Sequence, residues 1–285
     1  MNELRLLLRD ASLRLSHAGV GSPDTDAIAL LAHAWSTDVA DVRRAEVLGR
    51  MPDDAVLRRF SALIGERASR VPLQHLTGRA AFRHLDLAVG PGVFVPRPET
   101  EMLVDLVAPT LEALAAPVVV DLCTGSGALA LAVKDEHPAA QVYAAELSPD
   151  ACAWAQANRD RLGLDVQIRC ADALTAFPEL EGGADVVLSN PPYIPVGMVP
   201  VDAEVRDHDP ALALYGGSDD GLRIPLQVAA RAAQLLRPGG VMVMEHASTQ
   251  GDSLPARLRA QDVWREVGDH RDLTGLPRAV LIVRS

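Results

Sequence analysis

The stretch VVVDLCTGSGALA, residues 118–130, indicates the fold of this chain. Its apolar run predicts a short buried strand, its two glycines predict a tight turn, and the alanines and leucines that follow predict a helix. A strand, a glycine-rich turn and a helix in this order are typical of Rossmann-like domains, which bind ligands beyond the carboxyl ends of their strands. We therefore expect residues 121–127 to line a ligand site in an α/β domain.

Strand and helix patterns continue to alternate on the C-terminal side of this turn. The further strands that the sequence predicts are 141–146, 166–169, 185–189, 241–245 and 279–283, and the helices are 128–135, 149–162 and 221–236. Regular alternation of this kind predicts an α/β fold with a mostly parallel sheet.

The residues before this domain divide into two further parts. Apolar residues at helical spacing run through the first part, where helix starts are expected at Ser22-Pro23 and Pro52-Asp53. The second part shows alternating apolar residues punctuated by glycines, which predict a β-hairpin. We therefore expect a helical domain over residues 1–75, a hairpin linker over 76–98 and the α/β domain over 99–285.

The composition limits the kinds of partner and compartment. A formal net charge of -11 makes duplex DNA an unexpected main partner, because DNA-binding proteins usually carry a basic surface. The three cysteines, Cys123, Cys152 and Cys170, are odd in number and form no CxxC pair, so we expect no disulfide scaffold and a reducing compartment. The sequence predicts no signal peptide, membrane span or metal site. We expect a soluble cytoplasmic protein.

The ligand of the glycine turn has three interpretations. In the first, the turn is structural and binds nothing. In the second, it binds a dinucleotide, because residues 125–130 match the G-x-G-x-x-G/A pattern. In the third, it binds S-adenosylmethionine. Glu146 ends the next strand, where an acid commonly bonds ribose hydroxyls, and Asp172 follows the third strand at the same edge. Asp121 favours S-adenosylmethionine, because a carboxylate attracts the cationic amino-acid end of that cofactor and gains nothing from an anionic pyrophosphate.

A second motif, Asn190-Pro191-Pro192-Tyr193, follows the fourth predicted strand. The two prolines stiffen the loop and remove two backbone donors. The side-chain oxygen of Asn190 and the carbonyl of Pro191 are two acceptors that suit both hydrogens of an –NH2 group, and Tyr193 can pack on a planar amide or base. Such a site lets a weakly nucleophilic amide nitrogen become tetrahedral and stabilises the charge that develops on it, as methyl transfer requires.

With these motifs the chain resembles the HemK/PrmC family of protein-glutamine N5-methyltransferases over nearly its whole length. The segments that carry the resemblance are residues 94–101 (FVPRPETE), 121–127, 189–194 (SNPPYI), 209–222 and 271–278 (RDLTGLPR). The resemblance implies a class I S-adenosylmethionine-dependent methyltransferase whose N-terminal helical domain contacts its substrate. It also implies the reaction: methylation of the glutamine in the GGQ motif of peptide-chain release factors.

The resemblance also implies a role for individual residues. The implied cofactor-binding residues are Asp121, Cys123, Thr124, Gly125, Ser126, Gly127, Glu146, Asp172, Ala173 and Asn190. The implied catalytic residues are Asn190, Pro191 and Tyr193, and the implied substrate-binding residues are these three with Pro192, Arg97 and Glu99. We expect Arg97 and Glu99 to order the loop over the site and not to take part in the chemistry.

The sequence departs from the family pattern at three places. Cys123 stands where glycine is usual, which leaves the backbone there less freedom. Glu146 replaces the commoner aspartate and is one methylene longer. Residues 245–247 read EHA where the family often has EIG. None of these changes removes a group that methyl transfer needs.

Four alternatives remain beside the release factor. An adenine N6 of DNA or RNA offers the same –NH2 group, and DNA adenine methyltransferases share the Asn-Pro-Pro-Tyr motif. A DNA enzyme usually carries a basic target-reading segment, and none is evident here. A glutamine of a ribosomal protein is a closer alternative. An NAD-linked oxidoreductase would need a hydride-transfer constellation beyond the glycine turn. A non-catalytic binding module is disfavoured because Asn190 and the glycine turn are both present.

Overall fold

The computed structural model describes residues 2–285, whose contacts divide them into two compact units. The first unit is the chain as far as Arg79 together with residues 200–208, and the second is residues 80–199 with 209–285. The functional limits expected at residues 75 and 98 stay predictions.

The first unit is helical, as the spacing of its apolar residues predicted. Its helices are α1 (Glu3–His17), α2 (Pro23–Trp35), α3 (Val39–Leu48), α4 (Asp54–Ala68), α5 (Leu73–Thr77) and α9 (Ala203–His208). The Asp53 carboxylate caps α4 by accepting from the backbone N–H of Val56 at 2.9 Å, so the helix start expected here is confirmed. The buried Arg67 guanidinium joins three helices, because it pairs with Asp26 at 2.7 Å and with Glu204 at 2.8 Å.

The second unit is built on a seven-stranded sheet in the order β5-β4-β3-β6-β7-β9-β8. Its strands are β3 (Val118–Leu122), β4 (Gln141–Glu146), β5 (Val166–Cys170), β6 (Ala184–Ser189), β7 (Leu236–Glu245), β8 (Trp264–Arg271) and β9 (Pro277–Arg284). The pairs from β5 to β7 are parallel, and β9 pairs antiparallel with both β7 and β8. The expected mostly parallel sheet is therefore confirmed. A separate hairpin of β1 (Arg79–Phe82) and β2 (Leu85–Ala88) precedes it.

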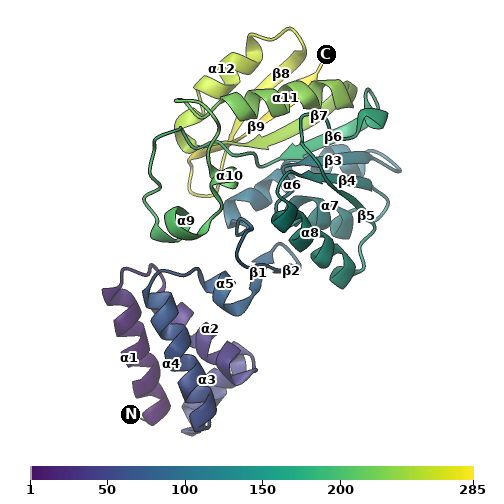
Figure 1. Ribbon diagram of the computed structural model, residues 1–285. Helices are drawn as coiled ribbons and strands as arrows, with labels where there is room; N and C mark the ends of the chain where they lie inside the picture. Colours follow the sequence, from purple (N-terminus) through teal and green to yellow (C-terminus); the bar gives the residue numbers. More distant parts are fainter. Residues whose placement is uncertain (1) are drawn as a thin grey trace. The chain divides into compact units, whose positions relative to one another are not determined.

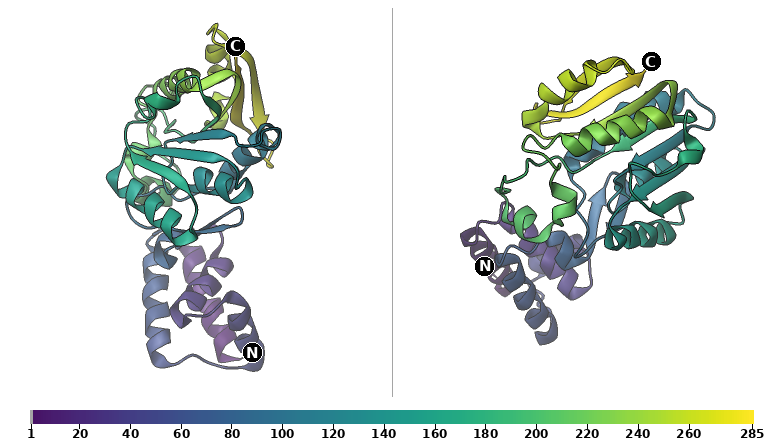
Figure 2. Two further views of the ribbon diagram at one scale, coloured as in Figure 1. Left: turned by 90° about the vertical axis from the view of Figure 1, so that its right-hand side faces the viewer. Right: turned by 45° about the horizontal axis from the view of Figure 1, so that its top comes forward.

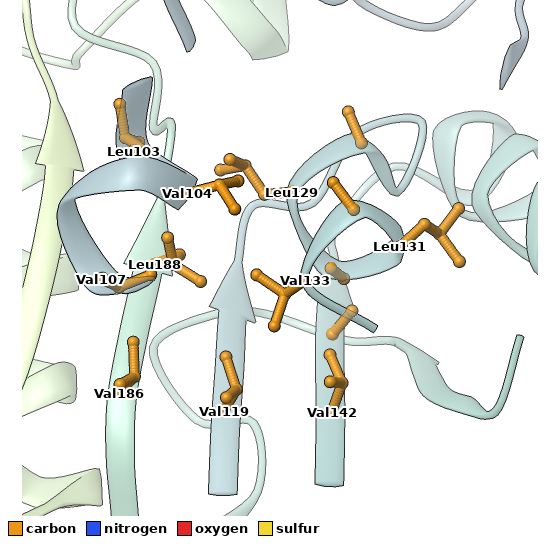
Figure 3. Close-up of a cluster of buried hydrophobic side chains, with 14 of the residues drawn as sticks. Leu103, Val104, Val107, Val119, Leu129, Leu131, Val133, Val142, Val186 and Leu188 are labelled. Carbon is orange, nitrogen blue, oxygen red and sulfur yellow. The ribbon is translucent and has the colours of Figure 1, made fainter. Parts of the chain in front are cut away.

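Helices cover both faces of this sheet (Figure 1 and Figure 2). Those on one face are α6 (Met102–Glu112), α7 (Ala128–Glu136) and α8 (Pro149–Leu162), and those on the other are α11 (Arg223–Leu235) and α12 (Ser253–Arg259). In Figure 3, Val104 of α6 lies beside Leu129 of α7, and Val133 of α7 lies close to Val119 and Val142 of the sheet. Each such side chain stabilises the fold by about 1.5–3 kcal/mol when fully buried.

Two features of this unit differ from the sequence-based expectation. Cys152 of α8 and Cys170 of β5 form a disulfide with their Cα atoms 5.7 Å apart, although the cysteine pattern gave no sign of one. The two residues are 18 apart in sequence, and only the packing of α8 against β5 brings them together. Strand β8 was also not predicted, because its sequence WREVGDHR is mostly polar and lies at the edge of the sheet.

Within residues 2–285, the structure contains no helix that combines the length and the apolar character needed to cross a membrane.

Candidate active site

The glycine turn after β3 uses three residues in the left-handed region. These are Cys123 (φ 65°), Gly125 (φ 59°) and Gly127 (φ 87°). A Cβ atom added to Gly127 would lie 2.9 Å from a methyl group of Leu131, so this glycine permits close packing of α7. A Cβ added to Gly125 would meet nothing within 4 Å, which leaves that side of the turn open for a ligand. Cys123 holds this conformation at a strain of about 1–2 kcal/mol, which explains why glycine is the usual residue here.

Asp121 lies fully buried at the end of β3, beneath the turn. Its Oδ2 atom accepts hydrogen bonds from the hydroxyl of Thr124 and from the backbone N–H of Ala130. Its Oδ1 atom is buried and accepts no hydrogen bond from the part of the chain that the structure describes. Burial raises the pKa of Asp121 to about 7. An unpaired buried acceptor of this kind fits a ligand that carries an ammonium group.

Two neighbouring strands bring further acids to the same edge. Glu146, at the end of β4, accepts from the backbone N–H of Gly125 at 2.8 Å and from that of Ser148 at 2.9 Å. Two residues beyond β5, Asp172 is exposed and accepts from the backbone N–H of Leu174 at 2.9 Å, and Ala173 is buried beside it. The open glycine turn, the unpaired Asp121 oxygen and these acids fit S-adenosylmethionine.

The Asn-Pro-Pro-Tyr loop follows β6 and is anchored by hydrogen bonds to Thr100 and to the buried Glu245. The Asn190 amide nitrogen donates to the hydroxyl of Thr100 at 3.2 Å, and this hydroxyl donates to Glu245 Oε2 at 2.5 Å. The hydroxyl of Tyr193 donates to Glu245 Oε1 at 3.0 Å. Pro191 and Pro192 are buried between them. Asn190 is therefore held with its amide nitrogen engaged and its amide oxygen on the opposite side.

Residues 214–221, which follow the motif in sequence, and Gln250 contact the backbone of the same loop. The backbone N–H of Ile194 donates to Leu214 at 2.7 Å, and the backbone N–H of Gly216 donates to Ile194 at 2.9 Å. A Cβ atom on Gly221 would overlap the carbonyl oxygen of Tyr193. The buried Gln250 amide donates to that same carbonyl at 2.9 Å. The backbone of the motif thus has little room to move.

The segment before the α/β domain contributes Arg97, Glu99 and Thr100. Arg97 pairs with Asp209 at 2.7 Å, and its guanidinium lies 4.9 Å from the ring centroid of Phe94. Arg97 therefore joins the segments before and after the motif. Glu99 is exposed, whereas Thr100 points inward and is buried.

Sequence reasoning missed three residues of this arrangement: Thr100, Glu245 and Gln250. The first stands in the quoted segment 94–101, and the second in the variant stretch 245–247. Glu245 reaches Tyr193 because β7 pairs with β6. Thr100 and Gln250 reach the motif from η1 (Pro98–Glu101) and η3 (Ser248–Gln250), and no local pattern reveals these contacts.

Comparison with known proteins agrees with these motifs. A family model described as PrmC N-terminal domain matches residues 7–78, and one described as Methyltransferase small domain matches residues 97–198. A protein of Streptomyces coelicolor named release factor glutamine methyltransferase is 48% identical over 98% of this chain and 97% of its own length. A protein of the same name from Bifidobacterium longum is 44% identical over 97% of this chain and 98% of its own length.

A solved structure supports this fold. A 16S rRNA methyltransferase of T. thermophilus, in complex with AdoMet and guanosine, has a TM-score of 0.50 at 20% identity, over 73% of this chain and 50% of that one. At this identity the likeness supports the S-adenosylmethionine-dependent methyltransferase fold alone. The full-length relatives carry the assignment further: this chain belongs to the release factor glutamine methyltransferase family.

Proposed function

We propose that this chain transfers a methyl group from S-adenosylmethionine to the side-chain amide nitrogen of the glutamine in the GGQ motif of peptide-chain release factors. The observation that carries the proposal is the fixed amide of Asn190, whose nitrogen donates to Thr100 and whose oxygen is turned away as an acceptor. The name shared by relatives that match nearly the full length supports the same substrate.

The residues at the carboxyl ends of β3, β4 and β5 would hold the cofactor. Asp121 Oδ1 would accept from its amino group, and residues 123–127, which are Cys123, Thr124, Gly125, Ser126 and Gly127, would line its methionine part. Glu146 would accept from the ribose hydroxyls, and Asp172 and Ala173 would border the adenine. S-adenosylmethionine supplies an electrophilic methyl group when it is bound.

The Asn-Pro-Pro-Tyr loop would hold the substrate amide. Asn190 Oδ1 and the Pro191 carbonyl would each accept one hydrogen of the glutamine –NH2 group. This arrangement lets the nitrogen become tetrahedral and stabilises the positive charge that develops on it. The Tyr193 ring would pack on the amide, Pro192 would keep the loop stiff, and Arg97 would hold the loop through Asp209.

The helical first unit would recognise the release factor, because it is the part that matches the PrmC N-terminal family. The working compartment would be the cytoplasm, where release factors act. A net charge of -11 supports a protein substrate over a duplex nucleic acid.

Methyl-labelled S-adenosylmethionine tests the proposal directly. The purified chain is incubated with a release factor or with its variant in which the GGQ glutamine is alanine. Label on the first and none on the second supports the proposal. No label on either, with cofactor binding measured by calorimetry, moves the substrate to a ribosomal-protein glutamine or an adenine amine. Absence of cofactor binding contradicts the methyltransferase assignment for these residues.

A further inference from the structure

Glu245 stands between two residues of the proposed active site without belonging to its motif. It ends β7 and is 1% exposed. Its Oε2 atom accepts from Thr100, which is 4% exposed and comes from the turn η1 (Pro98–Glu101). Its Oε1 atom accepts from Tyr193. The carboxylate thus connects the segment before the α/β domain with the Asn-Pro-Pro-Tyr loop.

The chemistry of these groups gives the hydrogen bonds a direction. Burial raises the pKa of Glu245 above its ordinary value. Above that pKa the carboxylate is ionised and only accepts, so Thr100 must use its single hydroxyl proton toward Glu245. The Thr100 oxygen can then only accept from Asn190, which must present its –NH2 group. The amide oxygen of Asn190 therefore faces the other way, where the proposed substrate amide needs an acceptor.

We propose that Glu245 and Thr100 are positioning residues that set the orientation of the Asn190 amide. The inference rests on the proposed function, since it assigns Asn190 Oδ1 to the substrate. An asparagine amide that is rotated by 180° has nearly the same shape and presents –NH2 in place of oxygen. Facing a substrate –NH2 group, the rotated form places two donors against each other and leaves both without acceptors.

Removing the Thr100 hydroxyl tests this relay. We expect Thr100→Val to lower kcat by about tenfold to a hundredfold, the range that misplacement of a reacting group produces, with unchanged affinity for S-adenosylmethionine. Thr100→Ser keeps the hydroxyl and should stay within about threefold of the wild-type kcat. Thr110→Val, on α6 of the same unit, is the matched control and should leave kcat unchanged. A Thr100→Val kcat within about twofold of the wild type would overturn the proposal.

The loss of kcat in Thr100→Val must also depend on the presence of the Asn190 side chain. In an Asn190→Ala background we expect Thr100→Val to cause no further loss of the residual turnover, because the amide that it orients is gone. A loss of the same factor as in the wild-type background would mean that Thr100 has a merely structural role.

Glu245→Gln tests whether the Glu245 carboxylate sets the direction of the hydrogen bond between Thr100 and Asn190. The glutamine –NH2 group must face one of the two hydroxyls, and if it faces Thr100 the hydroxyl proton turns toward Asn190 and favours the rotated amide. We expect kcat to fall by about tenfold or more with cofactor affinity kept. Wild-type kcat in this variant, together with rapid exchange of the Asn190 –NH2 protons, would show that the direction of these hydrogen bonds does not matter and would overturn the proposal.

A readout that needs no substrate separates failure of the relay from failure of the proposed function. In a nitrogen-15 spectrum, the side-chain –NH2 protons of Asn190, assigned by their loss in Asn190→Ala, should exchange slowly in the wild type and rapidly in Thr100→Val. Slow exchange in both proteins rejects the relay, whichever substrate is methylated. Missing methylation of the release factor, together with the expected exchange, rejects only the substrate.

Discussion

Glu146 Oε2 accepts a hydrogen bond of 2.8 Å from the backbone N–H of Gly125, which joins the acid at the end of β4 to the glycine turn after β3. The other oxygen of the same carboxylate accepts from Ser148 at the start of α8. Because each oxygen carries two lone pairs, the carboxylate can hold the turn and still accept from ribose hydroxyls.

This double role makes cofactor affinity sensitive to the length of the acid. We expect Glu146→Asp to weaken binding of S-adenosylmethionine by about tenfold to a hundredfold, because the shorter side chain loses one of its charge-assisted bonds, worth about 1.5–3 kcal/mol. Glu146→Ala should lose more, because every bond disappears. Calorimetric titration measures both constants. Equal affinity in the wild type and Glu146→Ala would mean that this acid does not contact the cofactor.

Asn190→Ala should separate cofactor binding from turnover. We expect kcat to fall by about a hundredfold to a thousandfold, the loss seen when one donor or acceptor at a developing charge is removed. Affinity for S-adenosylmethionine should change little, because the amide nitrogen is bonded to Thr100 and the oxygen is assigned to the substrate. Single-turnover rates and calorimetry measure the two effects. A parallel loss of both would place Asn190 chiefly on the cofactor.

The titration of Asp121 predicts a pH dependence of cofactor affinity. Burial raises the pKa of this carboxyl to about 7, so it is neutral well below pH 7 and ionised above it. Only the ionised form attracts an ammonium group. Affinity should therefore rise as the pH rises through 7, falling on the acid side by up to about tenfold for each pH unit. Above pH 8 it should level off.

Asp121→Asn is the control for this profile. Its amide oxygen can keep the bonds from Thr124 and Ala130 and leaves an –NH2 group at the unpaired position. We expect weak binding with no rise through pH 7. A rise of the same steepness in both proteins would assign the titration to another group.

The fold was predictable at elements that the local sequence pattern alone identifies. The turn at residues 121–127 and the strands beside it are local patterns, and the structure confirms them. Strand β8 and the disulfide were not predictable, because each depends on which elements pair in space. In the site, motifs named Asn190 and Tyr193, but Glu245 lies more than 50 residues further on and joins them only through the pairing of β6 with β7.

Reduction of the disulfide between Cys152 and Cys170 should destabilise the second unit. The bridge closes a loop over a sequence separation of 18, for which the loss of chain entropy in the unfolded state corresponds to about 3 kcal/mol. We expect the free energy of unfolding in urea to fall by about this amount after reduction. A variant with both cysteines changed to serine should not respond to the reductant. Equal stability of the reduced and oxidised wild type, with the free thiols counted, would contradict the prediction.

Alanine variants of two glycines with similar backbone angles distinguish the effect of backbone strain from damage to the active site. Gly221 (φ 71°) and Gly163 (φ 66°) both lie in the left-handed region, so the backbone strain of alanine at either position costs about 1 kcal/mol of stability. A Cβ on Gly163 meets nothing within 4 Å, whereas a Cβ on Gly221 overlaps the carbonyl oxygen of Tyr193. We expect Gly163→Ala to keep its kcat, and Gly221→Ala to lose kcat by about a hundredfold because the Asn-Pro-Pro-Tyr loop must shift. Methylation rates measured beside urea unfolding curves test the pair. Similar kcat values in the two variants would mean that the position of this loop does not limit the reaction.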